Sequence, residues 1–306
     1  MLRAARELNY QPNLLARGLR GSNTGLLGII VRDISAAPVA TVCHALLHGA
    51  PRIGYDMILT DAADCAKTLL RLATLMKSRL CDGIVLVGEL PEQDVVWDDY
   101  ARLGIPTVAI LHGAFELPVA SVSVDNATGV RLAVEHLVGL GHRRIGFVGT
   151  KWMYAVMQRG EVFRSVMQEH HLEVQDEHVV VAELSREGGA AGLRQLAQCA
   201  QPPTAVMAAT DLLACGMVQE AARLKIAVPS ELSIVGFDDV AEAALTYPPL
   251  TTVHQPFEEL AARALGWFES AFAGAQDARA QIVLEPELAV RGSTAPPARD
   301  GRKKRR

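Results

Sequence analysis

A repeated alternation of apolar runs and amphipathic helical stretches is the feature of this sequence that most restricts its fold. From residue 26 onward, runs rich in valine and isoleucine are separated by stretches with helical spacing, such as 65–78, 126–141 and 211–225. The strands that we expect cover residues 26–31, 56–61, 83–88, 106–111, 121–125, 144–149, 178–183, 204–209 and 232–237. Because such near-continuous apolar runs are typical of parallel strands covered on both faces, the pattern predicts an α/β protein with doubly wound parallel sheets.

The number of expected strands is too large for one sheet, which indicates two α/β lobes. Ligands of open α/β sheets bind outside the carboxyl ends of the strands, so a ligand is expected in a cleft between the lobes. The candidate ligand groups are the polar residues directly after the expected strands: Asp33, Ser35, His112, Asp125, Lys151, Trp152, Thr210, Asp211, Asp238 and Asp239.

Signals for a membrane or for export are missing from the sequence. The 306 residues, 50% of them hydrophobic, suffice for a large core. No uninterrupted apolar stretch reaches the roughly 18 residues of a membrane span. The N-terminus carries charges where a signal peptide has its apolar region. We therefore expect a cytoplasmic protein with no membrane partner.

The 5 cysteines indicate reduced thiols rather than a disulfide framework. They are scattered, odd in number and form no C-x-x-C pair, which also argues against a zinc ribbon. His44 and His48 lie four residues apart beside Cys43 on an expected helix, a spacing that a metal site also uses. A plain helix face is favoured, since the glutamate of an H-E-x-x-H motif is missing. We expect no metal site and no cofactor.

The charge is unevenly distributed, although the net charge is only −4. Residues 1–25 carry +3 from four arginines and one glutamate, and residues 299–306 carry +5 from six basic residues and one aspartate, which leaves −12 for the middle. An acidic body with a basic front end suits a protein that meets phosphate through its N-terminus. For the basic tail, 296–306, a solvated disordered segment is favoured over nucleic-acid binding.

Sequence signatures of catalysis are missing. The chain has no nucleophile elbow, no P-loop and no dinucleotide fingerprint after a strand. Asp238 and Asp239 look like a carboxylate pair, but adjacent residues of an extended segment point to opposite sides and make a poor acid–base dyad. The favoured interpretation is that one aspartate faces a ligand and the other caps the following helix. The protein is therefore not expected to be an enzyme.

The segment 11–25 has the pattern of a short connecting helix. Pro12 and Asn13 mark its start and Gly21 its end, with Leu19 among its apolar residues. A helix that short is marginal in water on its own. From these residues alone a plain linker is favoured, and the alternative is a helix that another molecule orders.

Several segments together resemble, in order along residues 1–296, the landmarks of the LacI family of bacterial transcription regulators. They are ELNYQPNLLARGLRG (7–21), TGLLGIIVRDIS (24–35), VDNATGVRLAVEHLVGLGHRRIGFVG (124–149), TAVMAATDLLACGMVQEA (204–221), LSIVGFDDV (232–240) and PPLTTVHQP (248–256). The resemblance implies a two-lobe, periplasmic-binding-protein-like core that binds a small effector, usually a sugar or sugar derivative, and works as a dimer.

The resemblance also implies that the segment 12–21 is a hinge helix, which folds when two copies lie in the minor groove of an operator. Its DNA-binding residues are then Asn13, Arg17, Leu19 and Arg20, with Leu19 wedged between base pairs. Only the last helix of a helix-turn-helix head precedes this segment. The sequence therefore predicts either a start that is placed too late or a headless effector binder with little affinity for operator DNA.

The resemblance assigns effector contacts position by position. Arg159 matches an arginine whose guanidinium grips vicinal hydroxyls or a carboxylate, and Asp238 matches a carboxylate that accepts from sugar hydroxyls. Gln255 matches a position that faces the cleft. His112 falls where several relatives have an aspartate, and Thr210 falls where they have an asparagine.

Part of the family's pocket pattern is missing from this chain. Residues 36–39 read Ala-Ala-Pro-Val where the family often has Asn-Pro-aromatic, so an aromatic wall of the pocket is absent. Trp152 either supplies a stacking surface in its place or packs in the core. Val162 stands where the family usually has a glycine. These differences leave the identity of the effector open.

The expected domains and function follow from these features. Residues 1–24 form the head remnant and hinge, 25–125 with 255–276 the N-terminal lobe, 126–254 with 277–295 the C-terminal lobe, and 296–306 the tail. We expect a homodimeric LacI-type regulator, a repressor, whose core binds a sugar or sugar acid and controls binding to operator DNA once a head is present. The alternative is a headless or exported-type sugar-binding protein without DNA-binding activity.

Overall fold

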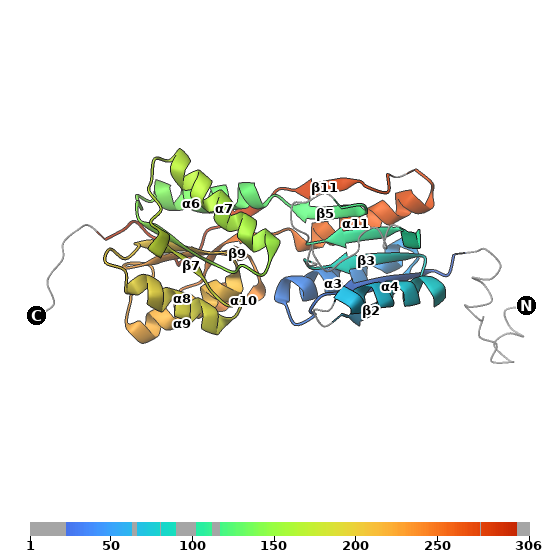
Figure 1. Ribbon diagram of the computed structural model, residues 1–306, viewed down its shortest axis with the longest axis horizontal. Helices are drawn as coiled ribbons and strands as arrows, with labels where there is room; N and C mark the ends of the chain where they lie inside the picture. Colours follow the sequence, from blue (N-terminus) through green and yellow to red (C-terminus); the bar gives the residue numbers. More distant parts are fainter. Residues whose placement is uncertain are drawn as a thin grey trace, which may run out of the picture. The chain divides into compact units, whose positions relative to one another are not determined.

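The computed structural model describes residues 23–62, 66–79, 81–89, 102–111, 117–275 and 277–298. The chain divides into two compact units: unit 1 takes Met1–Ser123 and Phe257–Ile282, and unit 2 takes Val124–Pro256 and Val283–Arg306. Within each unit, helices cover both faces of a sheet (Figure 1). The chain therefore passes from one unit to the other more than once.

Unit 1 is built on a six-stranded sheet in the order β11-β5-β4-β3-β1-β2. The strands are β1 (Leu26–Val31), β2 (Asp56–Asp61), β3 (Gly83–Val87), β4 (Thr107–Ile110), β5 (Ala120–Val124) and β11 (Gln281–Leu284). The pairs formed among β1 to β5 are parallel. Parallel pairing explains why β1, β3 and β4 are almost entirely buried apolar runs.

Helices cover both faces of the unit 1 sheet. On one face, α4 (Ala66–Arg79) places Met76 against Gly28 of β1; on the other, α11 (Phe257–Phe272) places Phe268 against Gly83 of β3. Helix α3 (Ala37–Gly49) packs against α11 and leads into the short 3-10 helix η1 (Ala50–Ile53). The two strand glycines thus leave the space that these large side chains fill.

Unit 2 has a six-stranded sheet in the order β12-β10-β9-β8-β6-β7. Its strands are β6 (Ile145–Gly149), β7 (Val179–Val181), β8 (Ala205–Ala208), β9 (Ser233–Asp238), β10 (Thr251–His254) and β12 (Glu287–Ala289). All pairs from β6 to β10 are parallel, and β12 is antiparallel to β10. The carboxyl ends of β8, β9 and β10 therefore meet at one edge.

Two apolar clusters cover the faces of the unit 2 sheet. Helices α6 (Asn126–Gly139) and α7 (Tyr154–Glu169) pack on one face, around Phe163 and Phe237. Helices α8 (Arg186–Ala197), α9 (Asp211–Leu224) and α10 (Ala241–Leu245) pack on the other, around Leu213. Figure 1 shows α6 and α7 on one side of the sheet and α8, α9 and α10 on the other. A 3-10 helix, η2 (Asp176–His178), precedes β7.

The predicted α/β class is confirmed, with two doubly wound, mainly parallel sheets. Every strand expected from an apolar run forms, and the observed ends lie within two residues of the predicted ones. The apolar-run criterion missed β10, β11 and β12, because these strands have only three or four residues and β11 and β12 are partly exposed. A short, half-exposed strand has no continuous apolar run to detect.

One boundary differs from the expected domain division. Residues 277–295 were assigned to the C-terminal lobe, but β11 belongs to the sheet of unit 1. The N–H groups of Ser121 and Asp125 donate to the carbonyl oxygens of Ala280 and Leu284. The bond from Ser121 to Ala280 lies within unit 1, which contains the segment up to Ile282.

In the described part of the chain, no helix combines the length and the apolarity that crossing a lipid bilayer requires. The predictions for residues 1–22, for His112 and for the tail 299–306 lie outside the described residues.

Candidate functional site

Arg159 is a buried cation near the middle of α7. Helical spacing places it three residues after Val156 and four before Phe163, on the face that packs against the sheet, so the side chain enters the interior with the apolar ones. Its guanidinium lies over the ring of Phe237, 3.6 Å from the centroid. Only 6% of the residue is exposed. The inward-facing side of this amphipathic helix therefore contains a charged residue among apolar ones.

Three neighbouring residues contact the guanidinium of Arg159. The Nη1 group donates to the carbonyl oxygen of Ala209 at 2.7 Å, and Nε donates to Oδ1 of Asn126 at 2.8 Å. Oδ1 of Asp238 lies 3.7 Å from Nη1. Burying a charge costs several kcal/mol unless it is paired and hydrogen-bonded, so these contacts are what make the position of Arg159 stable.

Asp238 and Gln255 complete a group that we call the Arg159 cluster, which consists of Arg159, Asp238 and Gln255. Asp238 ends β9, and Gln255 follows the end of β10. The amide Nε2 of Gln255 donates to Oδ1 of Asp238 at 2.6 Å. All three residues are buried. The cluster therefore joins a cation, an anion and an amide at the carboxyl edge of the unit 2 sheet.

The backbone turns sharply after β9. Asp238 and Asp239 have positive φ values of 130° and 60°, which residues other than glycine rarely adopt. Such strain persists only where the surroundings hold it. The chain turns at the end of β9, and the two carboxylates contact different partners, Gln255 for Asp238 and Arg291 for Asp239.

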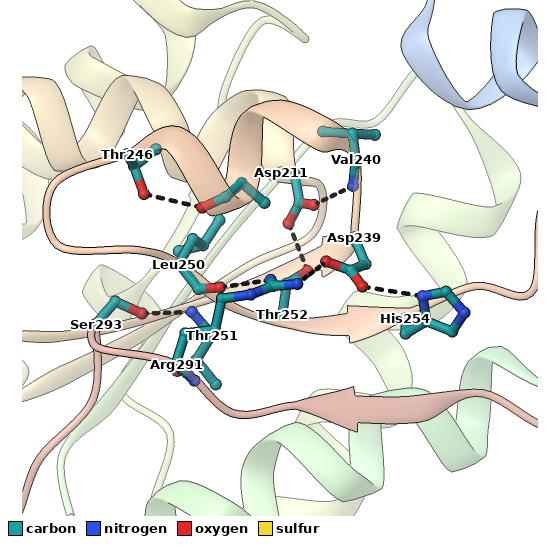
Figure 2. A network of polar contacts seen from close by, with 11 residues as sticks. Asp211, Asp239, Val240, Thr246, Leu250, Thr251, Thr252, His254, Arg291 and Ser293 are labelled. Carbon is teal, nitrogen blue, oxygen red and sulfur yellow. Dashed lines mark hydrogen bonds and ion pairs between the residues drawn. The ribbon is translucent and has the colours of Figure 1, made fainter.

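Asp211 is the anchor for this turn. It is the first residue of α9 and is fully buried. Its Oδ1 accepts from the hydroxyl of Thr252 at 2.5 Å and its Oδ2 from the backbone N–H of Val240 at 3.0 Å, as Figure 2 shows. The carboxylate occupies the space that a side chain at Gly236 would need. Asp211 thus ties α9 to β10 and to the residue that follows the turn.

Burial makes these carboxyl groups weak acids. Desolvation raises the pKa of Asp238 to about 6, although Arg159 and Gln255 act in the opposite direction. Desolvation, together with the charge of Asp238, raises the pKa of Asp211 to about 7. In both groups the cost of burying the ionised form exceeds the gain from the partners. The carboxyl edge of this sheet therefore takes up protons closer to neutral pH than exposed aspartates do.

Asp239 faces a different set of partners. Arg291 Nη2 donates to its Oδ1 at 2.6 Å, and Nδ1 of His254 lies 2.9 Å from its Oδ2 (Figure 2). Arg291 also donates through Nη1 to the carbonyl oxygen of Leu250 at 2.9 Å. The prediction that one of the adjacent aspartates caps the following helix is wrong: the N-cap of α10 is Val240, without a side-chain cap. The turn directs Asp239 to Arg291 instead.

The other predicted site residues fall in different surroundings. Thr210 is buried and serves as the N-cap of α9, where its hydroxyl accepts from the N–H of Leu213. Trp152 is 70% exposed, so the alternative that it packs in the core is wrong. Nζ of Lys151 lies 4.8 Å from the centroid of its ring. The structure thus brings Arg159, Asp238 and Gln255 together, while Thr210 acts as a helix cap and Trp152 lies at the surface.

Sequence reasoning missed three residues of this region. Asn126 accepts a hydrogen bond from Arg159, and Thr252 donates one to Asp211. Arg291 forms an ion pair with Asp239. Asn126 follows an aspartate that caps α6, which hides it among helix-start residues. Arg291 is 52 residues away from Asp239 in the chain, so no local pattern connects them. The position of Thr252 in the PPLTTVHQP segment was the one available signal.

The chain is similar to known proteins over most of its length. Residues 134–294 match the periplasmic binding protein-like domain family. The HTH-type transcriptional regulator DegA of Bacillus subtilis is 30% identical, over 95% of this chain and 87% of DegA. A LacI family transcriptional regulator from Mycobacterium smegmatis of known structure is 31% identical, with a TM-score of 0.74 over 89% of this chain and 100% of that one. The transcriptional regulator CelR, solved in complex with cellobiose, is 26% identical, with a TM-score of 0.80 over 95% of this chain and 88% of that one.

Two α/β units with matching parallel sheets, joined by several crossings of the chain, define the class of periplasmic-binding-protein-like folds. The relatives named above are regulators of transcription. The chain belongs to the LacI family of transcription regulators, and the resemblance seen in its sequence segments is confirmed.

Proposed function

We propose that this chain is a LacI-type repressor whose Arg159 cluster contacts a small effector, a sugar or a sugar acid. The observation that carries the proposal is the burial of Arg159, Asp238 and Gln255 together at the carboxyl edge of the unit 2 sheet. Open α/β sheets bind their ligands at this edge.

The chemistry of the cluster suits a ligand with neighbouring hydroxyls. A guanidinium donates two hydrogen bonds in a fixed plane, to vicinal hydroxyls or to a carboxylate. The carboxylate of Asp238 accepts from hydroxyls, and the amide of Gln255 does both. The solved CelR relative holds cellobiose, a sugar, which supports this ligand class. We assign Thr210, Trp152 and His112 as further contacts; the exposed ring of Trp152 offers a stacking face for a sugar.

The DNA-binding part of the proposal concerns the N-terminal segment. We propose that a homodimer contacts operator DNA through Asn13, Arg17, Leu19 and Arg20, together with a helix-turn-helix head. Effector binding then changes operator affinity, because a ligand that prefers one arrangement of the protein shifts its equilibrium. The relatives named as HTH-type transcriptional regulators support this part.

The effector part is tested first by thermal unfolding of the chain with a panel of neutral sugars and sugar acids. At least one member is expected to raise the melting temperature in a concentration-dependent manner. Arg159→Lys keeps the charge but loses the planar fork, and is expected to weaken that ligand at least tenfold. Arg131→Lys changes an exposed arginine of α6 and is the matched control, with unchanged affinity.

Two outcomes would contradict the proposal. Either no member of the panel shifts the melting temperature, or the confirmed ligand binds Arg159→Lys and wild type equally. With a ligand in hand, operator affinity of a head-bearing chain is measured by fluorescence anisotropy with and without it. Equal affinities would reject the coupling and leave a sugar-binding protein.

A further inference from the structure

Glu177, His178 and Cys199 gather on unit 2 at the amino ends of β7 and β8. The 3-10 helix η2 supplies Glu177 and His178 directly before β7, and the turn after α8 supplies Cys199 before β8. One donor atom from each residue lies within 4.8 Å of the other two. Across the described ranges, this is the one place where three His, Cys, Asp or Glu side chains meet in this way. We call it the amino-edge cluster.

His178 is oriented as a metal-binding histidine is. It is buried, with 2% of its surface exposed, and its Nε2 lies 2.9 Å from the carbonyl oxygen of Gln201. A carbonyl oxygen can only accept, so Nε2 carries the proton and Nδ1 carries the lone pair. A metal-ligating histidine almost always donates its other ring N–H to a carboxylate, a carbonyl or water in this manner. The carbonyl of Gln201 therefore fixes both the tautomer and the ring.

Cys199 and Glu177 bring two further donor types to the same place. Sγ of Cys199 lies 3.4 Å from the backbone carbonyl oxygen of Glu177, which holds the thiol over η2. Cys199 is half-buried and Glu177 is exposed, so the cluster is open to solvent on one side. An ion can thus enter, and the carboxylate is free to rotate toward it.

We propose that the amino-edge cluster binds Zn²⁺ or a chemically similar divalent transition metal through Cys199, His178 and Glu177, with water as the fourth ligand. Thiolate, imidazole and carboxylate are the donors that zinc takes, and three protein ligands plus water form an open tetrahedral site. With bond lengths of about 2.0–2.3 Å, tetrahedral ligand atoms lie about 3.3–3.8 Å apart. Donor atoms that lie up to 4.8 Å apart therefore need to close by up to about 1.5 Å. Rotation of the two more exposed side chains, Cys199 and Glu177, would supply this movement.

The site is separate from the Arg159 cluster. The sheet strands from β6 to β10 are parallel, and the Arg159 cluster lies at their carboxyl ends, whereas the amino-edge cluster lies at the amino ends. A metal here would clamp η2 to the turn after α8. Its binding does not depend on the effector, so either proposal can fail without the other.

The experiment titrates Co²⁺ into tag-free, fully reduced full-length chain under anaerobic conditions. Tetrahedral Co²⁺ with a thiolate ligand gives an intense near-ultraviolet charge-transfer band, which reports the sulfur directly. We expect one equivalent of Co²⁺ to develop the band and Zn²⁺ to displace it. Cys199→Ser is expected to lose the band and at least tenfold in affinity, while Cys81→Ser, the matched change at another partly buried thiol, keeps both.

Two more variants make the result decisive. His44 and His48, with ring centroids 4.3 Å apart on α3, are an alternative place for the ion, and His44→Asn is expected to leave the band unchanged. Should Cys199→Ser fail to fold, the exposed substitution Glu177→Gln carries the test, with about tenfold weaker binding expected. No charge-transfer band in reduced wild type, a band that survives Cys199→Ser, or unchanged affinity in Glu177→Gln would each overturn the proposal.

Discussion

The two units have the same sheet topology but bury different kinds of side chain. Counted in chain order within each unit, both sheets run last, fifth, fourth, third, first, second. Among the described residues, unit 1 buries one charged side chain, Glu89, whereas unit 2 buries Arg159, Asp211, Glu220 and Asp238. Unit 1 shows that this topology does not require a group of buried charges.

Buried charges are expensive, so their placement is informative. An unpaired buried ion costs several kcal/mol, and even a paired one is often no more stabilising than apolar side chains of the same volume. In unit 2, Arg159, Asp211 and Asp238 lie together at the carboxyl ends of the strands, where open α/β sheets bind ligands. The apolar pattern therefore explains the fold that both units share. The buried charges of unit 2 distinguish the carboxyl edge of its sheet from that of unit 1.

Helix packing provides the largest expected effect of a single substitution. In unit 2, α8 and α9 approach so closely that a side chain at Gly216 would overlap the backbone carbonyl of Arg186, and one at Gly189 the backbone of Leu213. Rotating a side chain cannot relieve an overlap with backbone. Gly216→Ala is expected to lower the unfolding free energy by about 3 kcal/mol, the upper part of the usual range for overpacking. Urea unfolding measures it, and an unchanged midpoint would show that these helices separate without cost.

Removing Arg159 tests the polar interior directly. Arg159→Ala leaves Asp238 buried without its cation and is expected to cost about 3 kcal/mol, the range for breaking a buried ion pair. Adding Asp238→Asn removes the stranded charge while keeping an acceptor for Gln255, so the double variant is expected to be more stable than Arg159→Ala alone. Urea unfolding of wild type, Arg159→Ala, Asp238→Asn and the double variant gives the coupling free energy between the two side chains. Strictly additive costs would show that the two side chains do not interact.

Protonation of Asp211 gives a pH dependence that belongs to unit 2. Its folded pKa of about 7 lies above the value of 3.8 expected when unfolded, so the folded state binds the proton more tightly. This stabilisation is fully present below pH 3.8 and is lost as the pH rises through about 7. Asp211→Asn keeps an acceptor for the N–H of Val240 and a donor toward Thr252. From pH 5 to pH 8, wild type is expected to lose on the order of 2 kcal/mol relative to this variant.

Thermal and urea unfolding at both pH values measure this difference. Comparing the variant with wild type at each pH cancels the contributions of titrating groups that do not interact with Asp211; Asp238, whose charge acts on Asp211, contributes to the difference. An equal difference at pH 5 and pH 8 would mean that Asp211 titrates as it does in the unfolded chain.

The sequence predicts those features whose signals lie close together along the chain. The apolar runs that became β1 and β9 are contiguous, so periodicity located them and the fold class followed. Asp238 was found because it directly follows a strand. By contrast, the contact of Arg291 with Asp239 joins residues far apart in the chain and exists only after the sheet forms.

The amino-edge cluster shows the same limit. His178 and Cys199 are 21 residues apart and lie before two different strands, so neither matches a metal-binding spacing. The pair that did match, His44 and His48, lies on one helix beside Cys43, whose side chain is buried in the core. Spacing along one helix is visible in a sequence, whereas proximity between two connections is a product of the fold.

Substitution of a glycine in unit 1 is expected to change the unfolding free energy least, and it serves as the control for Gly216→Ala. Gly266 lies within α11, and outside its own stretch of helix backbone no atom lies within 4 Å of where its side chain would be. Glycine inside a helix costs about 0.5–1 kcal/mol relative to alanine, because the unfolded chain is freer and the helix gains nothing in return. Gly266→Ala is therefore expected to raise the urea midpoint slightly. Since both substitutions add one methyl group within a helix, opposite signs would show that close backbone approach, and not helix propensity, decides the outcome in unit 2. A loss of stability in Gly266→Ala would instead indicate that α11 is packed as tightly as α9.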